Sequence, residues 1–282
     1  MKTIKFLFVT AIVAFLSMSC EKEFGLTDGI NDLNSIDPSE NSDSTNTQSP
    51  DSTIIPSPDS TITIIPTIVS DTGALATQIV YLSDFTEVEL KKIGEVEIIS
   101  GSEYKVEITD YKKLLPFAKV YLEGTRLVVS YDDIEQVMGS KLKVSITIPN
   151  KLSKTIVSGA GNINILSGYA SDGVQLIVSG AGNITATNIN SRSVNIEMPG
   201  SGVIEAKGTT GDLTLIAKGS GTIRCKELMC ANASCDISGV CTVFLSATDK
   251  LKVNALGVGG LTYYGNPILD LNIGMLFSLV KG

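Results

Sequence analysis

The sequence predicts an all-β protein whose folded part is a parallel β-solenoid, of the right-handed β-helix type, with coils of about 20 residues. Three observations support this fold class. The 282-residue chain has 26 glycines and no tryptophan or histidine. It is rich in Val, Ile, Thr and Ser, which favours strands and tight turns. A glycine-rich motif also recurs along its second half, with apolar residues at fixed places relative to it.

The first segment, 1–19, has the features of an export signal. Lys2 and Lys5 precede an apolar run over 6–16, which is too short to span a bilayer. The run ends in Leu-Ser-Met-Ser before Cys20, which resembles the lipobox of bacterial lipoprotein signals. We therefore expect cleavage before Cys20, acylation of this cysteine and attachment to a membrane by the lipid. An ordinary secretory signal with a chance cysteine is the alternative.

The second segment, 20–74, is predicted to be a disordered, lipidated tether. It is rich in Ser, Thr, Asp and Pro, and residues 21–72 hold ten acidic residues against one lysine. Such a composition buries too little apolar surface to fold. An Asp-Ser-Thr triplet recurs every eight residues, with its serines at Ser44, Ser52 and Ser60. It resembles an O-glycosylation acceptor of one large group of Gram-negative bacteria, and low-complexity repetition explains it equally well.

The remaining segment, 75–282, is predicted to be the folded domain. Its N-terminal part, 79–150, shows the alternation of half-buried strands, as in Leu142, Val144, Ile146 and Ile148. Residues 151–267 hold the glycine repeats, and 268–282 are expected to cap the C-terminal end. Most of the acidic excess in the formal net charge of −8 lies in the tether. The folded part is close to neutral and has no basic face, which argues against a nucleic-acid partner.

The glycine motif sets the length of the predicted coils. Ser-Gly-Ala-Gly-Asn-Ile occurs at 158–163 and again at 179–184, and it degrades in later copies. The first glycines of the copies are separated by 21, 20, 19, 20 and 18 residues; they are Gly159, Gly180, Gly200, Gly219, Gly239 and Gly257. We interpret them as corners, where the missing Cβ lets the backbone turn and lets coils approach closely.

Three positions around each glycine are predicted to form interior columns, because they are apolar in nearly every copy. Four residues before it stand Thr155, Leu176, Ile196, Leu215, Cys235 and Val253. Two before it stand Val157, Val178, Met198, Ala217, Ile237 and Ala255. Four after it stand Ile163, Ile184, Ile204, Ile223, Val243 and Leu261. The next position is mixed and predicted to be exposed; there Glu205 and Arg224 should be neighbours on adjacent coils.

The residues of the folded part resemble the putative auto-transporter adhesin, head GIN domain family. The resemblance covers about 79–267 and rests on Phe-Thr-Glu-Val at 85–88, the strand 142–149, the two Gly-Asn-Ile motifs and Tyr-Tyr-Gly-Asn-Pro at 263–267. It implies a β-solenoid on exported proteins, commonly lipoproteins of the Gram-negative envelope. It supplies no catalytic residues, and a shared fold is weak support for a shared function.

Catalytic chemistry has few candidate residues in this chain. Without histidine, the Ser/His and Cys/His schemes and all His-bearing metal sites are excluded. Carboxylates remain: Glu87 with Glu89, Glu95 with Glu97, and a group at 132–135. The acids of the coils occupy different repeat positions; they are Asp172, Glu197, Glu205, Asp212, Glu227, Asp236 and Asp249. We interpret them as solvated charges, and we assign no catalytic, cofactor-binding or metal-binding residue.

Four cysteines lie in the folded part, at Cys225, Cys230, Cys235 and Cys241. Their spacings do not match a Cys-x-x-Cys zinc site. An exported protein permits disulfides, yet no cysteine is predicted to stack on another. We expect buried thiols, and a bridge between Cys230 and Cys235 or between Cys225 and Cys230 stays open.

Three functions are consistent with these features. The first is a non-enzymatic module of the cell envelope, held on an outer membrane lipoprotein, that binds a protein or a glycan. The second is a carbohydrate-active enzyme using the scattered carboxylates. The third is a structural or stress-related envelope component with no soluble ligand. The pattern specifies neither the oligomeric state nor whether the lipid faces the periplasm or the exterior.

Overall fold

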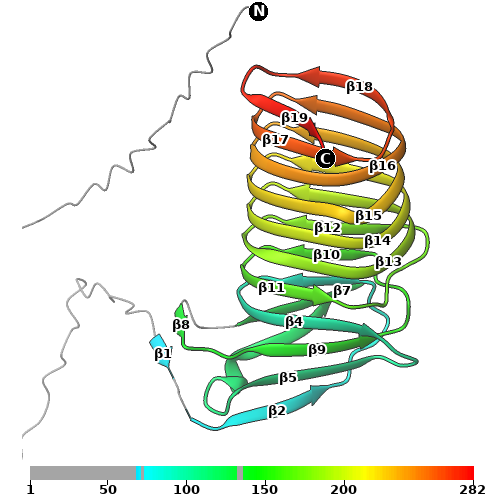
Figure 1. Ribbon diagram of the computed structural model, residues 1–282. Helices are drawn as coiled ribbons and strands as arrows, with labels where there is room; N and C mark the ends of the chain where they lie inside the picture. Colours follow the sequence, from blue (N-terminus) through cyan, green and yellow to red (C-terminus); the bar gives the residue numbers. More distant parts are fainter. Residues whose placement is uncertain (1–67, 71–72, 132–135) are drawn as a thin grey trace, which may run out of the picture. The chain divides into compact units, whose positions relative to one another are not determined.

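The computed structural model describes residues 68–70, 73–131 and 136–282. These residues form a parallel β-solenoid, in which strands from successive repeats lie one above another (Figure 1). One large sheet has 17 strands, and a second sheet joins β1 (Ile68–Ser70) to β8 (Gln136–Met138). No described helix is both long and apolar enough to cross a membrane.

The glycine repeats form the regular part of the solenoid. We call one turn of the coil a rung. The first rung consists of β10 and β11, and the second consists of β12 and the start of β13. The strands of the following rungs are long and bend around the coil. The bounds are β10 (Lys154–Val157), β11 (Ala160–Ile165), β12 (Val174–Val178), β13 (Ala181–Met198), β14 (Ser201–Ala217), β15 (Ser220–Ile237), β16 (Val240–Ala255) and β17 (Val258–Tyr264).

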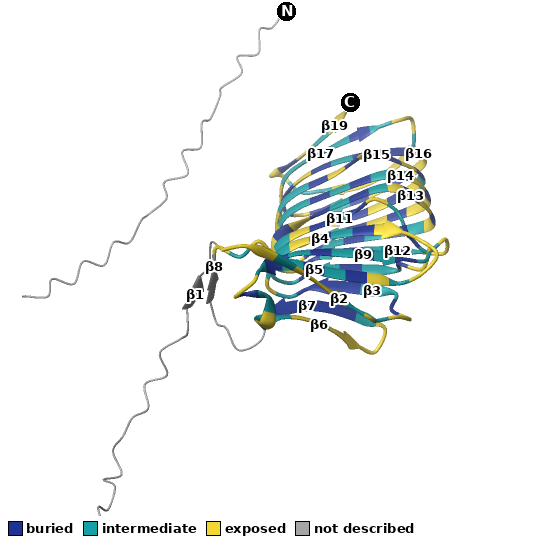
Figure 2. Cartoon of the chain, turned by 90° about the horizontal axis from the view of Figure 1, so that it is seen from below, coloured by how far each residue is buried: buried dark blue, intermediate teal, exposed yellow. Residues whose placement is uncertain are grey.

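The predicted interior columns are confirmed. Ile163, Ile184, Ile204 and Ile223 pair in parallel register from rung to rung, and each is fully buried. The column four residues before the glycine is also in register from Thr155 to Val253. Buried and more exposed residues alternate along the strands (Figure 2). Each rung thus covers the aliphatic side chains of its neighbour, as the period of two residues in a strand requires.

The glycines stand between consecutive strands and let the rungs touch. A Cβ atom on Gly200 would lie 2.2 Å from the carbonyl oxygen of Gly180, which is closer than any side chain tolerates. Gly202 and Gly221, in a second column two residues on, also have positive φ, at 148° and 149°. Cys241 takes the place of glycine in this second column on β16.

The N-terminal part adds two rungs and then closes this end. β3 (Glu87–Leu90) and β4 (Ile93–Ser100) pair with β10 and β11, and β7 (Arg126–Tyr131) and β9 (Lys143–Ile148) pair with β3 and β4 on the outer side. The chain therefore builds the outermost rung before it returns to β10.

Antiparallel strands cover that outer rung. β5 (Lys105–Tyr111) pairs with β9 and with β2 (Leu75–Val80), and β6 (Ala118–Glu123) pairs with β7. A short 3₁₀ helix, η1 (Leu115–Phe117), precedes β6. These strands leave the outer rung without an open edge along most of its length, which limits strand pairing with other chains.

The C-terminal segment expected as a cap forms one further rung. β18 (Ile268–Ile273) pairs with β16, and β19 (Phe277–Lys281) pairs with β17. Their outer edges carry no strand within the described part of the chain. Several apolar side chains are exposed there, with Ile268 at 77% and Met275 at 97%.

Candidate functional site

A shallow cleft lies on the outer surface of β14–β17, and we call it the flank cleft. Its volume is about 290 Å³. Glu205 of β14, Arg224 of β15 and Phe244 of β16 line it and lie in register on adjacent rungs. Each directly follows a buried residue of the Ile163 column, so the alternation of a strand points it outward. The ladder predicted from the repeats therefore faces outward, with Arg224 exposed and with Glu205 and Phe244 half-buried.

An irregularity in β15 supplies the rest of the cleft. The register with β16 shifts between Cys225 and Met229, so β15 holds extra residues at this point. Lys226 and Glu227 are both exposed although they are consecutive, as in a β-bulge. Lys207 and Tyr264 complete the lining from β14 and β17. Bulges re-aim side chains, and this one brings two charged groups to one surface.

The carboxylates of the cleft are both bound by one lysine. The Lys207 ammonium lies 2.9 Å from Glu205 and 3.4 Å from Glu227. The hydrogen bond to Glu205 is the largest cause of a raised pKa for Lys207, so this lysine stays charged. The neighbours Glu205 and Arg224 lie side by side as predicted, but the ion pair of Glu205 is made with Lys207.

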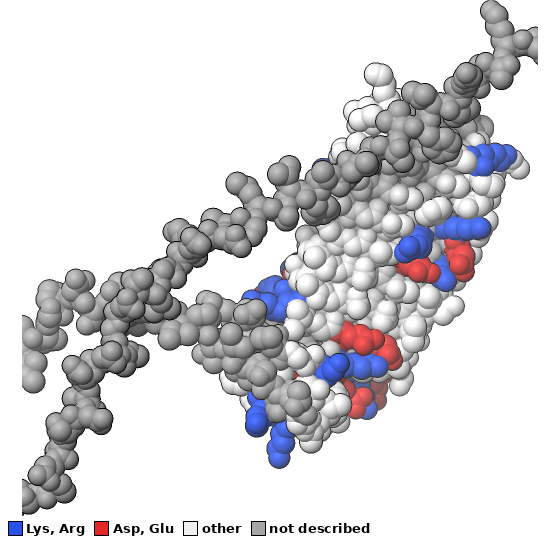
Figure 3. All heavy atoms as spheres, turned by 60° about the vertical axis from the view of Figure 1, so that its left-hand side comes forward, with Lys and Arg blue, Asp and Glu red and all other residues white. Residues whose placement is uncertain are grey.

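Two cations of the cleft remain without a carboxylate. The Lys226 ammonium lies 4.3 Å from the centre of the Tyr264 ring, which is a cation–π distance. Arg224 is exposed and has no ion pair or hydrogen bond among the described residues. The site thus combines two aromatic side chains with two cations that have no carboxylate partner in the described part of the chain. Charged side chains of the face shown in Figure 3 gather in small separate clusters with uncharged surface between them.

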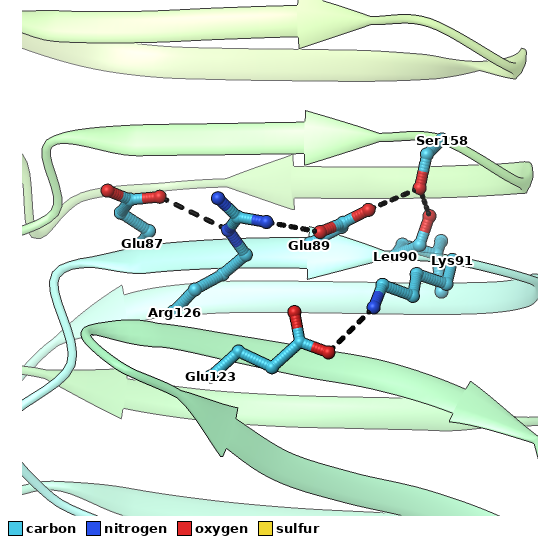
Figure 4. A network of polar contacts seen from close by, with 7 residues as sticks. All are labelled: Glu87, Glu89, Leu90, Lys91, Glu123, Arg126 and Ser158. Atoms are coloured by element: carbon cyan, nitrogen blue, oxygen red, sulfur yellow. Dashed lines mark hydrogen bonds and ion pairs between the residues drawn. The ribbon is translucent and has the colours of Figure 1, made fainter.

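The carboxylate pair Glu87 and Glu89 is held by an arginine and is not a free acid/base pair (Figure 4). The Arg126 guanidinium lies 3.2 Å from Glu87 and 3.0 Å from Glu89. The Ser158 hydroxyl donates a further bond of 2.6 Å to Glu89. Because one guanidinium binds both carboxylates, we assign this cluster a structural role at the junction of β3, β7 and β10.

The other carboxylates predicted as candidates also bind neighbouring side chains or occupy different repeat positions. Glu97 binds Lys143 at 3.0 Å, and Glu95 accepts a hydrogen bond of 3.2 Å from Asn164. On the coils, Asp212 and Asp236 accept bonds from asparagines of the next rung. In the described part of the chain, no three His, Cys, Asp or Glu side chains come together in a way that could hold a metal ion.

The cysteines of the folded part are free thiols in the structure, and all are buried. Cys235 lies in an interior column between Leu215 and Val253. The remaining predicted site residues, Cys20, Ser44, Ser52 and Ser60, lie outside the described residues, as do 132–135.

The sequence placed Glu205, Arg224 and Phe244 on one ladder but did not identify a cleft. It missed four other lining residues, Lys207, Lys226, Glu227 and Tyr264. Lys207, Lys226 and Tyr264 each stand seven residues after the first glycine of their copy, a position outside the predicted columns, and Glu227 follows in the bulge. The spacing between glycines offers one signal, since the step from Gly219 to Gly239 is longer than the steps on either side.

The model of the family described as putative auto-transporter adhesin, head GIN domain, matches residues 84–267. The chain belongs to this family. The match covers the solenoid from the start of β3 to the beginning of the last rung, so the resemblance expected over 79–267 is confirmed. No curated protein matches the chain.

Solved structures share the fold of this head GIN domain at low identity. A putative adhesin from Bacteroides fragilis has 21% identity and a TM-score of 0.72, over 76% of this chain and 100% of that one. A putative adhesin from Parabacteroides distasonis has 20% identity and a TM-score of 0.55, over 77% and 100%. A putative lipid binding protein from the same species has 17% identity and a TM-score of 0.56, over 76% and 97%.

Proposed function

We propose that this protein is a lipid-anchored component of the bacterial cell envelope whose head GIN solenoid is a non-catalytic adhesion module. It binds a protein or a glycan through the flank cleft. The observation that carries this proposal is the combination of Phe244 and Tyr264 with Arg224 and Lys226, two cations without a carboxylate partner among the described residues, on consecutive rungs. Aromatic residues and arginine are enriched among the residues that dominate binding energy.

The anchor in this proposal is an acylated Cys20. Two or more acyl chains hold a protein on a membrane without a transmembrane helix. A Cys20→Ala variant should therefore appear as uncleaved precursor or in the soluble fraction of the cell, while the wild type stays with membranes. Unchanged membrane retention of the mature variant would contradict acylation at this residue.

The acidic segment that follows Cys20 is proposed as a tether that holds the domain away from the lipid surface. In this proposal Ser44, Ser52 and Ser60 carry O-linked sugars. Intact-mass measurement of the mature protein tests this, and the expected result is a mass above that of the lipidated polypeptide. Substitution of all three serines by alanine should remove the excess. A wild-type mass without added sugar would leave simple sequence repetition as the explanation.

Protease shaving of intact cells tests whether the domain is displayed outside. The proposed adhesion module should be degraded while a periplasmic marker stays intact, and full protection of the domain would contradict adhesion to an external partner. Catalysis is tested separately with purified protein and envelope glycans. Turnover that Glu205→Gln or Glu227→Gln abolishes would favour a carbohydrate-active enzyme over a binding module.

A further inference from the structure

We infer that the flank cleft binds an acidic saccharide, with a sugar ring against Phe244 and its acidic group at Arg224 and at Lys226, which stands over the Tyr264 ring. This inference rests on the proposed function and names the ligand class of the same site. It follows from three properties of the cleft. They are its local charge, its backbone groups, which are already hydrogen-bonded to neighbouring rungs, and the uncharged polar residues beside it.

The local charge favours an anion. Three cations and two carboxylates line the cleft, and Lys207 is bound by both carboxylates. Arg224 and Lys226 therefore have no carboxylate of the cleft as a partner, although the whole chain has a formal charge of −8. A guanidinium binds carboxylate and sulfate groups through paired hydrogen bonds, which gives orientation as well as affinity.

The backbone of this flank is not available to a peptide strand. β14, β15 and β16 are each hydrogen-bonded to a rung on both sides. An extended peptide could not add to the sheet here, which removes the main-chain hydrogen bonds that give such complexes their affinity. The cleft also lacks the row of aliphatic side chains that an amphipathic helix needs.

The uncharged neighbours of the cleft suit sugar hydroxyls. The ladder that holds Glu205, Arg224 and Phe244 continues as Thr185 and Asn164 on one side and as Thr262 on the other. Adjacent rungs are about 4.8 Å apart, which is close to the length of one pyranose unit along an extended glycan. Donors and acceptors on successive rungs can therefore meet successive sugars, while the Phe244 ring covers an apolar face of one sugar.

The experiment measures binding of the full-length protein in detergent to pairs of polymers that share a sugar backbone and differ in charge. The probes are polygalacturonate with its fully methyl-esterified form, and sulfated dextran with plain dextran. Binding to at least one acidic polymer should be about tenfold tighter than to its neutral counterpart, the strength of about one charge-assisted contact. Arg224→Gln and Lys226→Gln should each remove most of this preference and leave binding of the neutral polymer unchanged.

Matched variants separate the site from general charge effects. Phe244→Ala should weaken the binding of both acidic and neutral polymers. Arg192 is an exposed arginine on β13 outside the cleft, and Arg192→Gln should leave the binding of both kinds of polymer unchanged. Thermal unfolding of every variant shows that the solenoid is intact. Poly-glutamate is the acidic polymer without sugars. If it binds as tightly as the acidic polysaccharides, the preference is explained by charge alone and the inference is overturned.

The remaining outcomes distinguish this inference from the proposed function. Equal binding of acidic and neutral polymers that Phe244→Ala weakens would leave a glycan-binding module and overturn the preference for an acid. Acidic binding that survives in both cation variants would overturn the site. No binding to any of the polymers would overturn the saccharide ligand, and shaving of intact cells would still decide whether the domain is displayed.

Discussion

A Cβ atom on Gly219 would lie 1.8 Å from the carbonyl oxygen of Gly200 on the preceding rung. The obstacle is backbone, which cannot move without separating two hydrogen-bonded strands. We expect Gly219→Ala to lower the free energy of unfolding by about 3 kcal/mol or more, the upper end for overpacked sites. Urea unfolding followed by circular dichroism measures this loss.

Gly274→Ala is the matched control for this substitution. Its Cβ would have ordinary contacts, none closer than 3.4 Å. We expect a change within about 0.5 kcal/mol of the wild type, as for most surface substitutions. Equal stability of the Gly219 and Gly274 variants would mean that the rungs are not packed backbone to backbone at this corner.

The regular coils could be predicted because one local constraint repeats. Each corner needs a residue without a Cβ, and each interior column needs an apolar side chain at a fixed offset from it. The alignment by glycine therefore predicts one interior column that contains Ile163, Ile184, Ile204 and Ile223. Cys241 breaks the pattern in the second glycine column, and the rung still keeps its register there.

The N-terminal end and the flank cleft could not be predicted in the same way. β7 and β9 lie outside β3 and β4 although they follow them in sequence. Such non-local pairing has no periodic marker. The cleft depends on extra residues after Cys225, which leave the consecutive Lys226 and Glu227 both exposed. Glu227 has no counterpart in the adjacent repeats, so an alignment by the first glycine cannot place it beside the ladder.

The ion pairs of Arg126 provide a second prediction. Glu89 is 7% exposed, forms its ion pair with Arg126 and accepts a hydrogen bond from the Ser158 hydroxyl. Arg126→Met leaves this carboxylate without its cation. We expect a loss of about 2–3 kcal/mol, below the range for a fully buried pair because the arginine side chain is 33% exposed. Denaturant unfolding measures the loss.

Two further variants identify its cause. Adding Glu89→Gln to Arg126→Met removes the stranded charge and should restore part of the stability. Arg192→Met removes the side chain that pairs with Asp172 at 3.7 Å on an exposed surface, and it should cost less than about 0.5 kcal/mol. If Arg126→Met were as mild as Arg192→Met, the cluster in Figure 4 would contribute little to the junction of β3 and β7.

Asp110 provides a third prediction, because its side chain is fully buried and accepts hydrogen bonds at both oxygens. The donors are the Tyr131 hydroxyl, the Ser140 hydroxyl at 3.0 Å, and the backbone amides of Tyr111 at 2.8 Å and Lys141 at 2.9 Å. Asp110→Ala leaves several buried donors without an acceptor. We expect a loss of at least about 3 kcal/mol, since each such group costs roughly 1–3 kcal/mol.

Tyr131→Phe is the control for this polar cluster, because it removes one donor and leaves the carboxyl group with three. It should cost about 1 kcal/mol. Amide hydrogen exchange distinguishes a local from a global effect, and the Asp110 variant should lose protection first in β5, β7 and β9. Unchanged protection there would show that water replaces the carboxyl group, and the prediction would be wrong.

The buried cysteines provide the last prediction. Burial raises the pKa of Cys230 and of Cys235 to about 12, and it raises the pKa of Cys225 further. The thiolate is the reactive form. We therefore expect native protein at pH 8 to react slowly with iodoacetamide, and unfolded protein to react quickly at Cys225, Cys230, Cys235 and Cys241. Mass spectrometry after each treatment gives the thiol count.

The same pKa shifts predict a loss of stability at alkaline pH. Unfolded thiols ionise near pH 9, whereas folded Cys230 and Cys235 keep their protons to about pH 12. Their contribution is complete below pH 9 and falls between pH 9 and 12, by up to about 1.4 kcal/mol per thiol and pH unit. The urea midpoint should drop between pH 8 and 10, and Cys235→Ala should reduce that drop.

Fewer than four reactive thiols in denaturant would instead support a bridge from Cys230 to Cys235 or Cys225. The alkaline loss of stability attributed to the bridged pair would then disappear, because a disulfide has no thiol to ionise.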